Sequence, residues 1–295
     1  MKKLTISDRK MVFGYLAILL AAMLFGSVST LAKPTLVNID PLVLSFLVYL
    51  LASLVFTPLA YKTKSSLSKK DLVLVITIAL SGAVAAPILY FVGLEQTTAS
   101  DAALLSNGEI AFSILLAVLF FKERIERKHY AAIAMVLGGV IIVATNLQLS
   151  FSVMDLKNMG NILVLGATVF WALDNNISKI ISKRVDVARI VQLKSLIGGA
   201  ILLAVVLILQ IPINVQLENI PNIVLLGTAG FGISIYLFIY GLKSIGTVKT
   251  VMIFSTSSVF GLLFARMFLN EQISYYQIIA VVIMIAGLYL LQKTK

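Results

Sequence analysis

Long apolar stretches separated by short polar segments run through the whole chain. A helix that crosses a bilayer needs roughly 20 predominantly apolar residues. Stretches of about this length predict membrane-spanning helices at residues 12–33, 41–61, 71–93, 99–121, 129–146, 160–182, 187–210, 220–242, 247–268 and 274–292. The stretches are continuous, whereas membrane barrels have short segments that alternate between apolar and polar residues. We therefore expect an all-α integral membrane protein with ten transmembrane helices.

The chain nearly repeats itself after half its length. Residues 93–140 align without a gap on residues 241–288. Identical pairs in this alignment include Gly93 with Gly241, Phe112 with Phe260, Phe120 with Phe268, and Glu123 with Glu271, an offset of 148 (241 minus 93). A second alignment, at an offset of 146 (171 minus 25), pairs Phe25 with Trp171, Lys33 with Lys179, and Asp40 with Asp186. An internal repeat of this kind is typical of secondary transporters.

The number of helices in each half dictates how the halves are related. A unit of five membrane-spanning helices begins on one side of the membrane and ends on the other. The second unit therefore starts on the opposite side and has the opposite orientation. We therefore expect residues 1–147 and 148–295 to form two inverted five-helix repeats. Such repeats are related by a pseudo-two-fold axis in the membrane plane, and the substrate site lies near the midplane between them.

The charges of the chain fall in a regular pattern. Hydrophobic residues make up 60% of the chain, charged residues 13%, and the net charge is +11. A strongly positive net charge is also typical of proteins that bind nucleic acid. Here, however, the basic residues are confined to every second loop. Examples are Lys62, Lys64, Lys69 and Lys70, then Lys122, Arg124, Arg127 and Lys128, then Lys183, Arg184 and Arg189. Basic loops mark the cytoplasmic side. The pattern predicts a multi-pass protein of the cell (inner) membrane with both termini in the cytoplasm and no nucleic-acid partner.

Several kinds of chemistry find no support in the sequence. The chain has no cysteine, which excludes disulfides and thiolate metal sites. It also has no H-E-x-x-H, P-loop or G-x-S-x-G motif, so we expect no enzyme activity, no cofactor and no direct use of ATP. The first apolar stretch is longer than the core of a signal peptide, so we interpret it as a retained helix. The oligomeric state stays open, and a monomer is compatible with the sequence.

One segment of the chain, together with shorter motifs elsewhere, resembles a known protein family. The segment Ala99–Ile125 reads ASDAALLSNGEIAFSILLAVLFFKERI. It is similar to the fourth helix of EamA-type proteins in the drug/metabolite transporter superfamily, whose pattern is roughly A-S-x-A-A-L-L … E-P-V-F … L-A-V-L-F-L-x-E-R. Other matching motifs are Leu137-Gly138-Gly139-Val140 in the fifth helix, Leu24-Phe25-Gly26-Ser27 with Lys33 in the first, and Phe170-Trp171-Ala172 with Lys179 in the sixth. The resemblance covers essentially all 295 residues.

The resemblance implies ten helices in two inverted halves. It also implies movement of small metabolites, including amino acids, across the inner membrane, commonly outward. Two positions depart from the family pattern. Ile110 stands where the family often has proline, and Val48 stands where an arginine is common in the second helix, although Lys194 keeps a basic residue at the matching place.

Charged residues inside the apolar stretches are the strongest candidates for chemistry. A charge at mid-bilayer costs roughly 2.5–3.5 kcal/mol on insertion scales, so it needs a partner or a water-filled cavity. Glu109 lies near the midplane, and its repeat match is Ser257. It is either a structural carboxylate that pairs with a lysine or caps a broken helix, or a group that binds substrate or a proton. Burial favours the neutral acid, and a wet cavity favours the carboxylate.

A second polar cluster lies in the sixth and seventh stretches. Asp174, Asn175 and Lys194 lie at similar depth. Asp174 and Lys194 therefore either form a salt bridge, or line the cavity with Asn175 and hold the amino and carboxyl groups of a substrate. Trp171, one turn away, is either an apolar or cation–π wall of that cavity or an ordinary packing residue.

Other polar side chains are weaker candidates. A cavity between the halves would be lined also by Ser27, Tyr90, Asn107, Tyr236 and Ser257, although small polar residues also permit close helix packing. We expect Lys33 to extend to the membrane surface and Glu271 to cap a helix or pair with Lys33 or Arg266.

Together these features favour a secondary transporter that works by alternating access. Its expected partners are the lipid bilayer and a small-molecule substrate, an amino acid or related amine, which it exports. Protons are the candidate coupling ion. The alternative is a non-transporting channel, receptor or scaffold.

Overall fold

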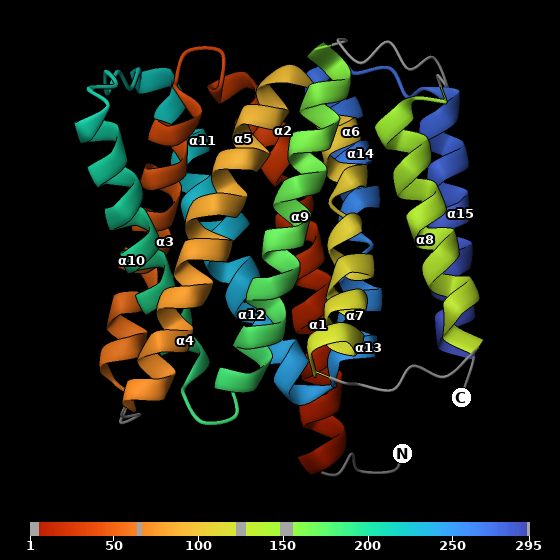
Figure 1. Cartoon of the computed structure of the whole chain (residues 1–295), viewed down its shortest axis with the longest axis horizontal. Coiled ribbons are helices and arrows are strands. Elements are labelled where there is room, and N and C mark those ends of the chain that lie inside the picture. Colours follow the sequence, from red (N-terminus) through yellow and green to blue (C-terminus); the bar gives the residue numbers. More distant parts are fainter. Residues whose placement is uncertain (1–5, 64–66, 122–127, 148–155, 294–295) are drawn as a thin grey trace.

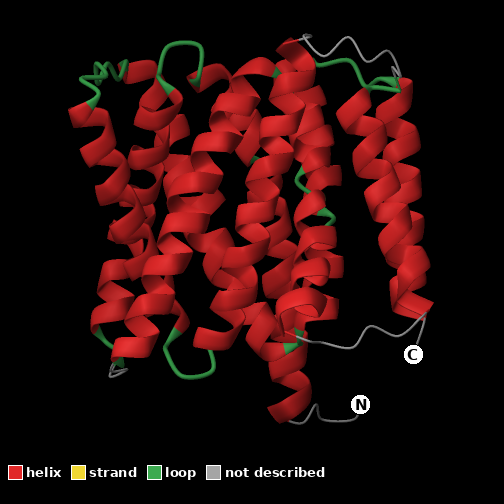
Figure 2. Cartoon of the chain, in the orientation of Figure 1, coloured by secondary structure: helices red, strands yellow, loops and turns green. Residues whose placement is uncertain are grey.

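The computed structural model describes residues 6–63, 67–121, 128–147 and 156–293. These residues form a bundle of helices joined by short loops, and no strand occurs among them (Figure 2). Within these ranges, six helical stretches are long and apolar enough to cross a membrane: Val12–Thr35, Pro41–Tyr61, Lys69–Gln96, Val187–Ile208, Leu217–Ser244 and Lys249–Leu269. Shorter apolar helices occupy Tyr130–Thr145 and Tyr275–Leu290. The protein is therefore an all-helical, multi-pass membrane protein.

The helices follow the predicted apolar stretches closely. In chain order they are α1 (Ile6–Gly26), α2 (Val28–Thr35), α3 (Pro41–Tyr61), α4 (Lys69–Leu80), the π-helix η1 (Ser81–Ala85), α5 (Ala86–Gln96), α6 (Ala99–Leu105), α7 (Gly108–Phe121), α8 (Lys128–Thr145), α9 (Leu156–Ile181), α10 (Val187–Ile208), the 3₁₀-helix η2 (Leu217–Asn219), α11 (Ile220–Leu225), the π-helix η3 (Leu226–Ile233), α12 (Ser234–Ser244), α13 (Thr247–Phe254), α14 (Ser257–Leu269) and α15 (Tyr275–Lys293).

Side-chain caps determine where several helices begin. The Asp40 side chain accepts a hydrogen bond from the backbone of Leu42 (2.8 Å) at the start of α3. Asp186, its repeat match, does the same at the start of α10. Ser68 and Asp71 form a capping box at the start of α4. Such caps satisfy the free N–H groups of a first turn and fix the point where each helix starts.

Three of the predicted helices are interrupted near their middle, which the apolar pattern does not predict. The breaks lie at Ser27 between α1 and α2, at residues 106–107 between α6 and α7, and at residues 255–256 between α13 and α14. Hydroxyl groups at the breaks bond to carbonyls of the preceding turn: Ser27 Oγ to Leu24 O (2.7 Å) and Ser255 Oγ to Met252 O (2.6 Å). These bonds compete with the helical ladder. By contrast, α9 runs without a break.

Small residues let neighbouring helices approach closely. Helices α8 and α15 lie side by side at one edge of the bundle, and α1, α5 and α9 lie in its middle (Figure 1). A Cβ on Gly93 would come within 2.7 Å of the backbone oxygen of Gly160, where α5 meets α9. On α10, a Cβ on Gly199 would come within 2.8 Å of Leu50 on α3. These contacts hold the helices that carry the polar residues close together.

Candidate functional site

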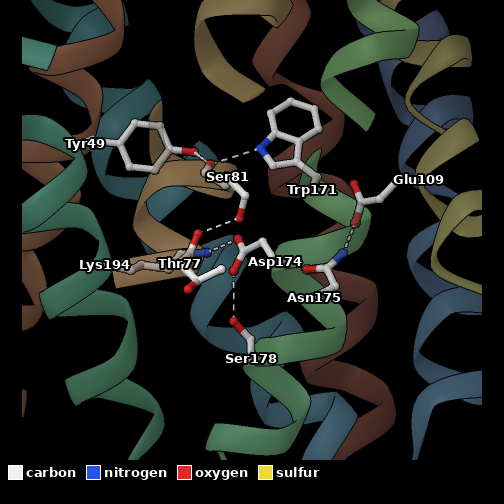
Figure 3. A network of polar contacts seen from close by, with 10 residues as sticks. Tyr49, Thr77, Ser81, Glu109, Trp171, Asp174, Asn175, Ser178 and Lys194 are labelled. Carbon is white, nitrogen blue, oxygen red and sulfur yellow. Dashed lines mark hydrogen bonds and ion pairs between the residues drawn. The ribbon is translucent and has the colours of Figure 1, made fainter. Parts of the chain in front are cut away.

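The unbroken helix α9 carries the centre of the polar cluster. Trp171, Asp174 and Asn175 are spaced three and four residues apart, which places them on one face of the helix. That face points into the bundle: Trp171 is 5% exposed and Asp174 is 3% exposed. Figure 3 shows these side chains directed toward α10, η1 and α7.

Asp174 forms a buried ion pair with Lys194 of α10, as expected from their equal depth. Lys194 is only 2% exposed. Ser178, one turn further along α9, donates a hydrogen bond to the other carboxylate oxygen of Asp174 (2.9 Å). In an apolar bundle, a charge without a partner is costly, so the pair and the extra hydrogen bond keep both charges in place.

The π-helix η1 supplies a further anchor for this cluster. The carbonyl oxygen of Gly82 accepts hydrogen bonds from the Tyr49 hydroxyl (2.7 Å) and from the Trp171 indole nitrogen (3.3 Å). A π-helical turn widens the backbone ladder and frees groups for such contacts. Gly82 also packs directly on Asp174, because a Cβ at this position would overlap the Asp174 carboxylate. The glycine therefore makes room for the ion pair.

Replacing Gly82 with alanine is expected to destabilise the protein by about 1–3 kcal/mol, the usual cost of overpacking. The new methyl group would push Asp174 away from Lys194. The measurement is the midpoint of thermal unfolding in detergent. Gly138→Ala is the matched control, because a Cβ at Gly138 meets no atom within 4 Å. Equal midpoints for the two variants would contradict the close packing of Gly82 on the ion pair.

Glu109 lies in the first turn of α7, immediately after a helix break. It is 7% exposed and accepts a hydrogen bond from the side-chain amide of Asn175 on α9. Across the described part of the chain, no basic side chain lies within ion-pair distance of Glu109. Its carboxyl group therefore has one neutral partner and stays available to a ligand.

Glu109 and the α9 cluster line one cavity, which we call the central cavity. It has a volume of about 30 Å³ and is lined by Phe25, Glu109, Trp171, Asp174, Asn175, Lys194, Phe231, Ile235, Phe238 and Phe254. The Phe25 ring lies edge-on to Trp171, with 5.7 Å between ring centroids, and 5.2 Å from Phe254. The cavity is thus a polar cluster faced by aromatic rings.

The structure brings half of the candidate site residues into the central cavity: Glu109, Trp171, Asp174, Asn175 and Lys194. The other five lie elsewhere. Tyr90 and Ser257 line a smaller neighbouring cavity. Asn107 donates to Ser258 (2.8 Å), Tyr236 stacks on Phe56 with ring centroids 5.1 Å apart, and Ser27 bonds to its own backbone turn.

The aromatic wall of the cavity is the part that the sequence did not indicate. Phe231 and Phe254 are ordinary apolar residues in apolar stretches, so nothing in the sequence distinguishes them from packing residues. The repeat offers a signal for two others. Phe25 is the match of Trp171, and Phe238 is the match of Tyr90 (238 minus 148), so a search of positions equivalent to the candidates would have found them.

Charged residues at the helix ends have structural partners. Lys33 donates hydrogen bonds to the carbonyls of Leu94 (2.8 Å), Glu95 (3.0 Å) and Thr97 (2.6 Å), and thereby closes the C-terminal end of α5. Glu271 accepts from the backbone N–H groups of Ala99 and Ser100, both at 2.9 Å, and thereby caps α6. The repeat match of Glu271, Glu123, lies outside the described residues.

Comparisons with known proteins agree with this architecture. The model of the EamA-like transporter family matches residues 12–145 and 158–292. An uncharacterized transporter of Methanothermobacter thermautotrophicus is 31% identical over 95% of this chain and 86% of its own length. Another, from Clostridium kluyveri, is 25% identical over 93% and 91%. A solved crystal structure with 19% identity superposes with a TM-score of 0.71 over 96% of both chains, which shows a shared fold. The chain belongs to the EamA-like transporter family.

Proposed function

We propose that this transporter is a secondary carrier of a small molecule that bears an ammonium group, either an amino acid or a related amine. The observation that carries the proposal is the composition of the central cavity. Lys194 and Asp174 neutralise each other, whereas Glu109 has a neutral partner, so the cavity offers one carboxyl group without a countercharge. Buried ionisable groups in membrane helices mark substrate and proton pathways.

The walls of the cavity suit the same ligand. A cation within about 6 Å of an aromatic ring face is attracted by the ring quadrupole, and Trp171, Phe25 and Phe254 surround the space beside Glu109. The ammonium group of an amino acid would lie between Glu109 and these rings. Its carboxylate would face the Asn175 amide and Lys194.

We also propose that the fold is ten transmembrane helices in two inverted repeats, residues 1–147 and 148–295. Three structural features support this arrangement. Each half has a π-helix, η1 or η3, and each has a broken helix; the breaks, at residues 106–107 and 255–256, overlap in the repeat alignment, in which residue 107 matches residue 255 (107 plus 148). Asp40 and Asp186 cap matching helices. The family model also matches once in each half. Interrupted helices at the interface of inverted repeats are typical sites of binding and of alternating access.

The proposed orientation places both termini in the cytoplasm and the substrate path across the inner membrane. Single cysteines at Lys62 and Lys243 should react with a membrane-impermeant thiol reagent from the cytoplasm only, and those at Asn38 and Asn270 from outside only, because basic residues mark the cytoplasmic loops. All four positions are exposed, and the chain has no cysteine of its own. Reaction of the Asn38 cysteine from the cytoplasmic side would contradict this topology.

We propose outward transport, because export is the common direction of the family that the sequence resembles. We also propose protons as the coupling ion, because Glu109 can exchange a proton for a cationic substrate.

The test of the proposed function begins with thermal stabilisation of the purified protein by amino acids, amines, nucleosides and organic acids. Ligands that stabilise it are then followed as radiolabelled substrates in vesicles containing the protein. Saturable exchange of an amine supports the proposal. Stabilisation by anions alone, or ligand binding with no exchange, would overturn it and favour a different substrate or a non-transporting role.

A further inference from the structure

A second cavity lies beside the central cavity, and Phe25 lines both. It has a volume of about 10 Å³, close to the minimum that holds one water molecule, and is lined by Phe25, Gly26, Ser29, Tyr90, Ala103, Ser106 and Ser257. We call it the hydroxyl cavity, because its polar side chains are three serines and one tyrosine. None of its lining residues carries a charge, so it differs in chemistry from the central cavity.

The hydroxyl cavity is built from the same repeat positions as the central cavity. The matching pairs are Phe25 with Trp171 and Ser29 with Asn175 at an offset of 146, and Tyr90 with Phe238, Ser106 with Phe254, and Ser257 with Glu109 at an offset of 148. The fold therefore forms the cavity twice. In the second copy hydroxyl groups replace the carboxyl group of Glu109 and the amide of Asn175.

The two cavities lie on opposite sides of the contact between Phe25 and Trp171. Helices α1 and α9 run in opposite directions through the bundle (Figure 1). Ser29 follows Phe25 by about one turn toward one membrane surface, and Asn175 follows Trp171 by about one turn toward the other. The Phe25 ring, edge-on to Trp171, thus forms the partition between the two spaces.

One polar group of the hydroxyl cavity is poorly satisfied. Ser29 is 1% exposed, and its hydroxyl oxygen has no hydrogen bond of ordinary geometry. The neighbouring Ser106, by contrast, donates to the carbonyl oxygen of Ala102 (2.9 Å). Buried polar groups in proteins are normally hydrogen-bonded, and each exception calls for an explanation such as a water, an ion or a functional role. A ligand group in this cavity would supply the missing partner.

We propose that the hydroxyl cavity is a second subsite for the same substrate, and that it binds a neutral hydroxyl group, which is about the size of the water molecule that the cavity can hold. The ammonium end would occupy the central cavity, and the hydroxyl end would pass Phe25 to reach Ser29, Tyr90 and Ser257. Hydroxyl groups both donate and accept, so the lining suits a hydroxyl ligand, whereas the absence of charged lining residues disfavours a second ionic group. This inference rests on the proposed function and narrows its substrate class.

Pairs of ligands that differ in one hydroxyl group test the subsite. 5-Aminopentanol is compared with hexylamine, and 6-aminohexanol with heptylamine, because each pair exchanges a hydroxyl for a methyl group of similar size and has a chain long enough to pass the Phe25 ring. Wild-type protein should bind the hydroxyl member about fivefold more tightly, the effect of one neutral hydrogen bond. Binding is measured by thermal shift titration and by competition for exchange in vesicles.

Single substitutions then show which residue is responsible for the preference for the hydroxyl ligand. Ser29→Ala should abolish the preference for the hydroxyl member without loss of stability, because it removes a hydroxyl that lacks a hydrogen bond. The matched control is Ser45→Ala on α3, whose buried hydroxyl already donates to Pro41 O (2.7 Å); it should keep the preference. Glu109→Gln should weaken both members of each pair.

The outcomes separate the two proposals. If amines bind through Glu109 but neither the hydroxyl group nor Ser29 alters their affinity, the subsite is refuted and the proposed function stands. A hydroxyl preference that survives in Ser29→Ala would also refute the assignment of this cavity. If no amine binds to the wild-type protein, the proposed function itself fails.

Discussion

Replacing Lys194 with methionine is expected to destabilise the protein strongly, by about 3–5 kcal/mol, the usual effect of removing one partner of a buried ion pair. The change leaves the Asp174 carboxylate at 3% exposure with Ser178 as its remaining polar contact. The measurement is the thermal unfolding midpoint of purified protein in detergent, with Lys62→Met as the control. Lys62 carries the same charge in an exposed position after α3, so its replacement should have little effect.

The double variant Asp174→Asn with Lys194→Met shows whether the unpaired charge is the cause. Replacing both partners of a buried pair by neutral groups is often neutral or stabilising, so the double variant should recover most of the lost stability. A Lys194→Met protein as stable as the wild type would contradict a buried, charged pair. Transport by the stable double variant then shows whether the pair serves only the fold or also binds the carboxylate of the substrate.

Replacing Glu109 with glutamine is expected to weaken amine binding roughly 10- to 100-fold, because hydrogen bonds to charged groups contribute about 1.5–3 kcal/mol. The change nearly preserves the shape of the side chain but removes the group that exchanges a proton or a cation. At saturating substrate, the variant should still exchange labelled for unlabelled substrate across vesicle membranes. It should lose accumulation driven by a pH gradient, which requires a proton to cross with each cycle.

The control for this experiment is Glu95→Gln, the same substitution at an exposed residue of α5 that lies outside the central cavity. It should keep wild-type affinity and pH dependence. A stable and active Glu109→Gln protein with wild-type pH dependence would rule out proton coupling through this residue. Unchanged affinity for amines in the same protein would rule out its role in binding.

The positions of the helices could be predicted from the sequence because the signal is long and local. About 20 apolar residues in a row have few structural alternatives in a membrane chain, and Asp40 and Asp186 mark where two of the helices start. The breaks could not be predicted in the same way. Serine at residues 27 and 255 stands at a break, but Ser178 lies in the unbroken α9. Whether a hydroxyl interrupts a helix depends on what packs beside it.

The polar half of the central cavity could also be predicted, and the apolar half could not. Glu109, Asp174 and Lys194 are expensive in a membrane, so their presence already implies partners or a cavity. An extra phenylalanine in an apolar stretch carries no such cost. Asn107 shows a further limit. It lies two residues before Glu109 but, because the helix is broken there, its amide contacts Ser258 on α14 instead of the cavity.

The hydrogen bond between Asn175 and Glu109 connects a continuous helix with a broken one, and this affects how the carrier moves without substrate. Asn175 belongs to the continuous helix α9, whereas Glu109 follows the break between α6 and α7. A swing of α7 away from α9 would separate the two side chains. With substrate present, an ammonium group can take the place of Asn175 during that swing. Without substrate or a bound proton, Glu109 would lose its partner and gain none. Return of the unloaded, unprotonated carrier should therefore be the slow step, so that at high pH substrate on the far side of the membrane accelerates efflux and one-for-one exchange outpaces net flow.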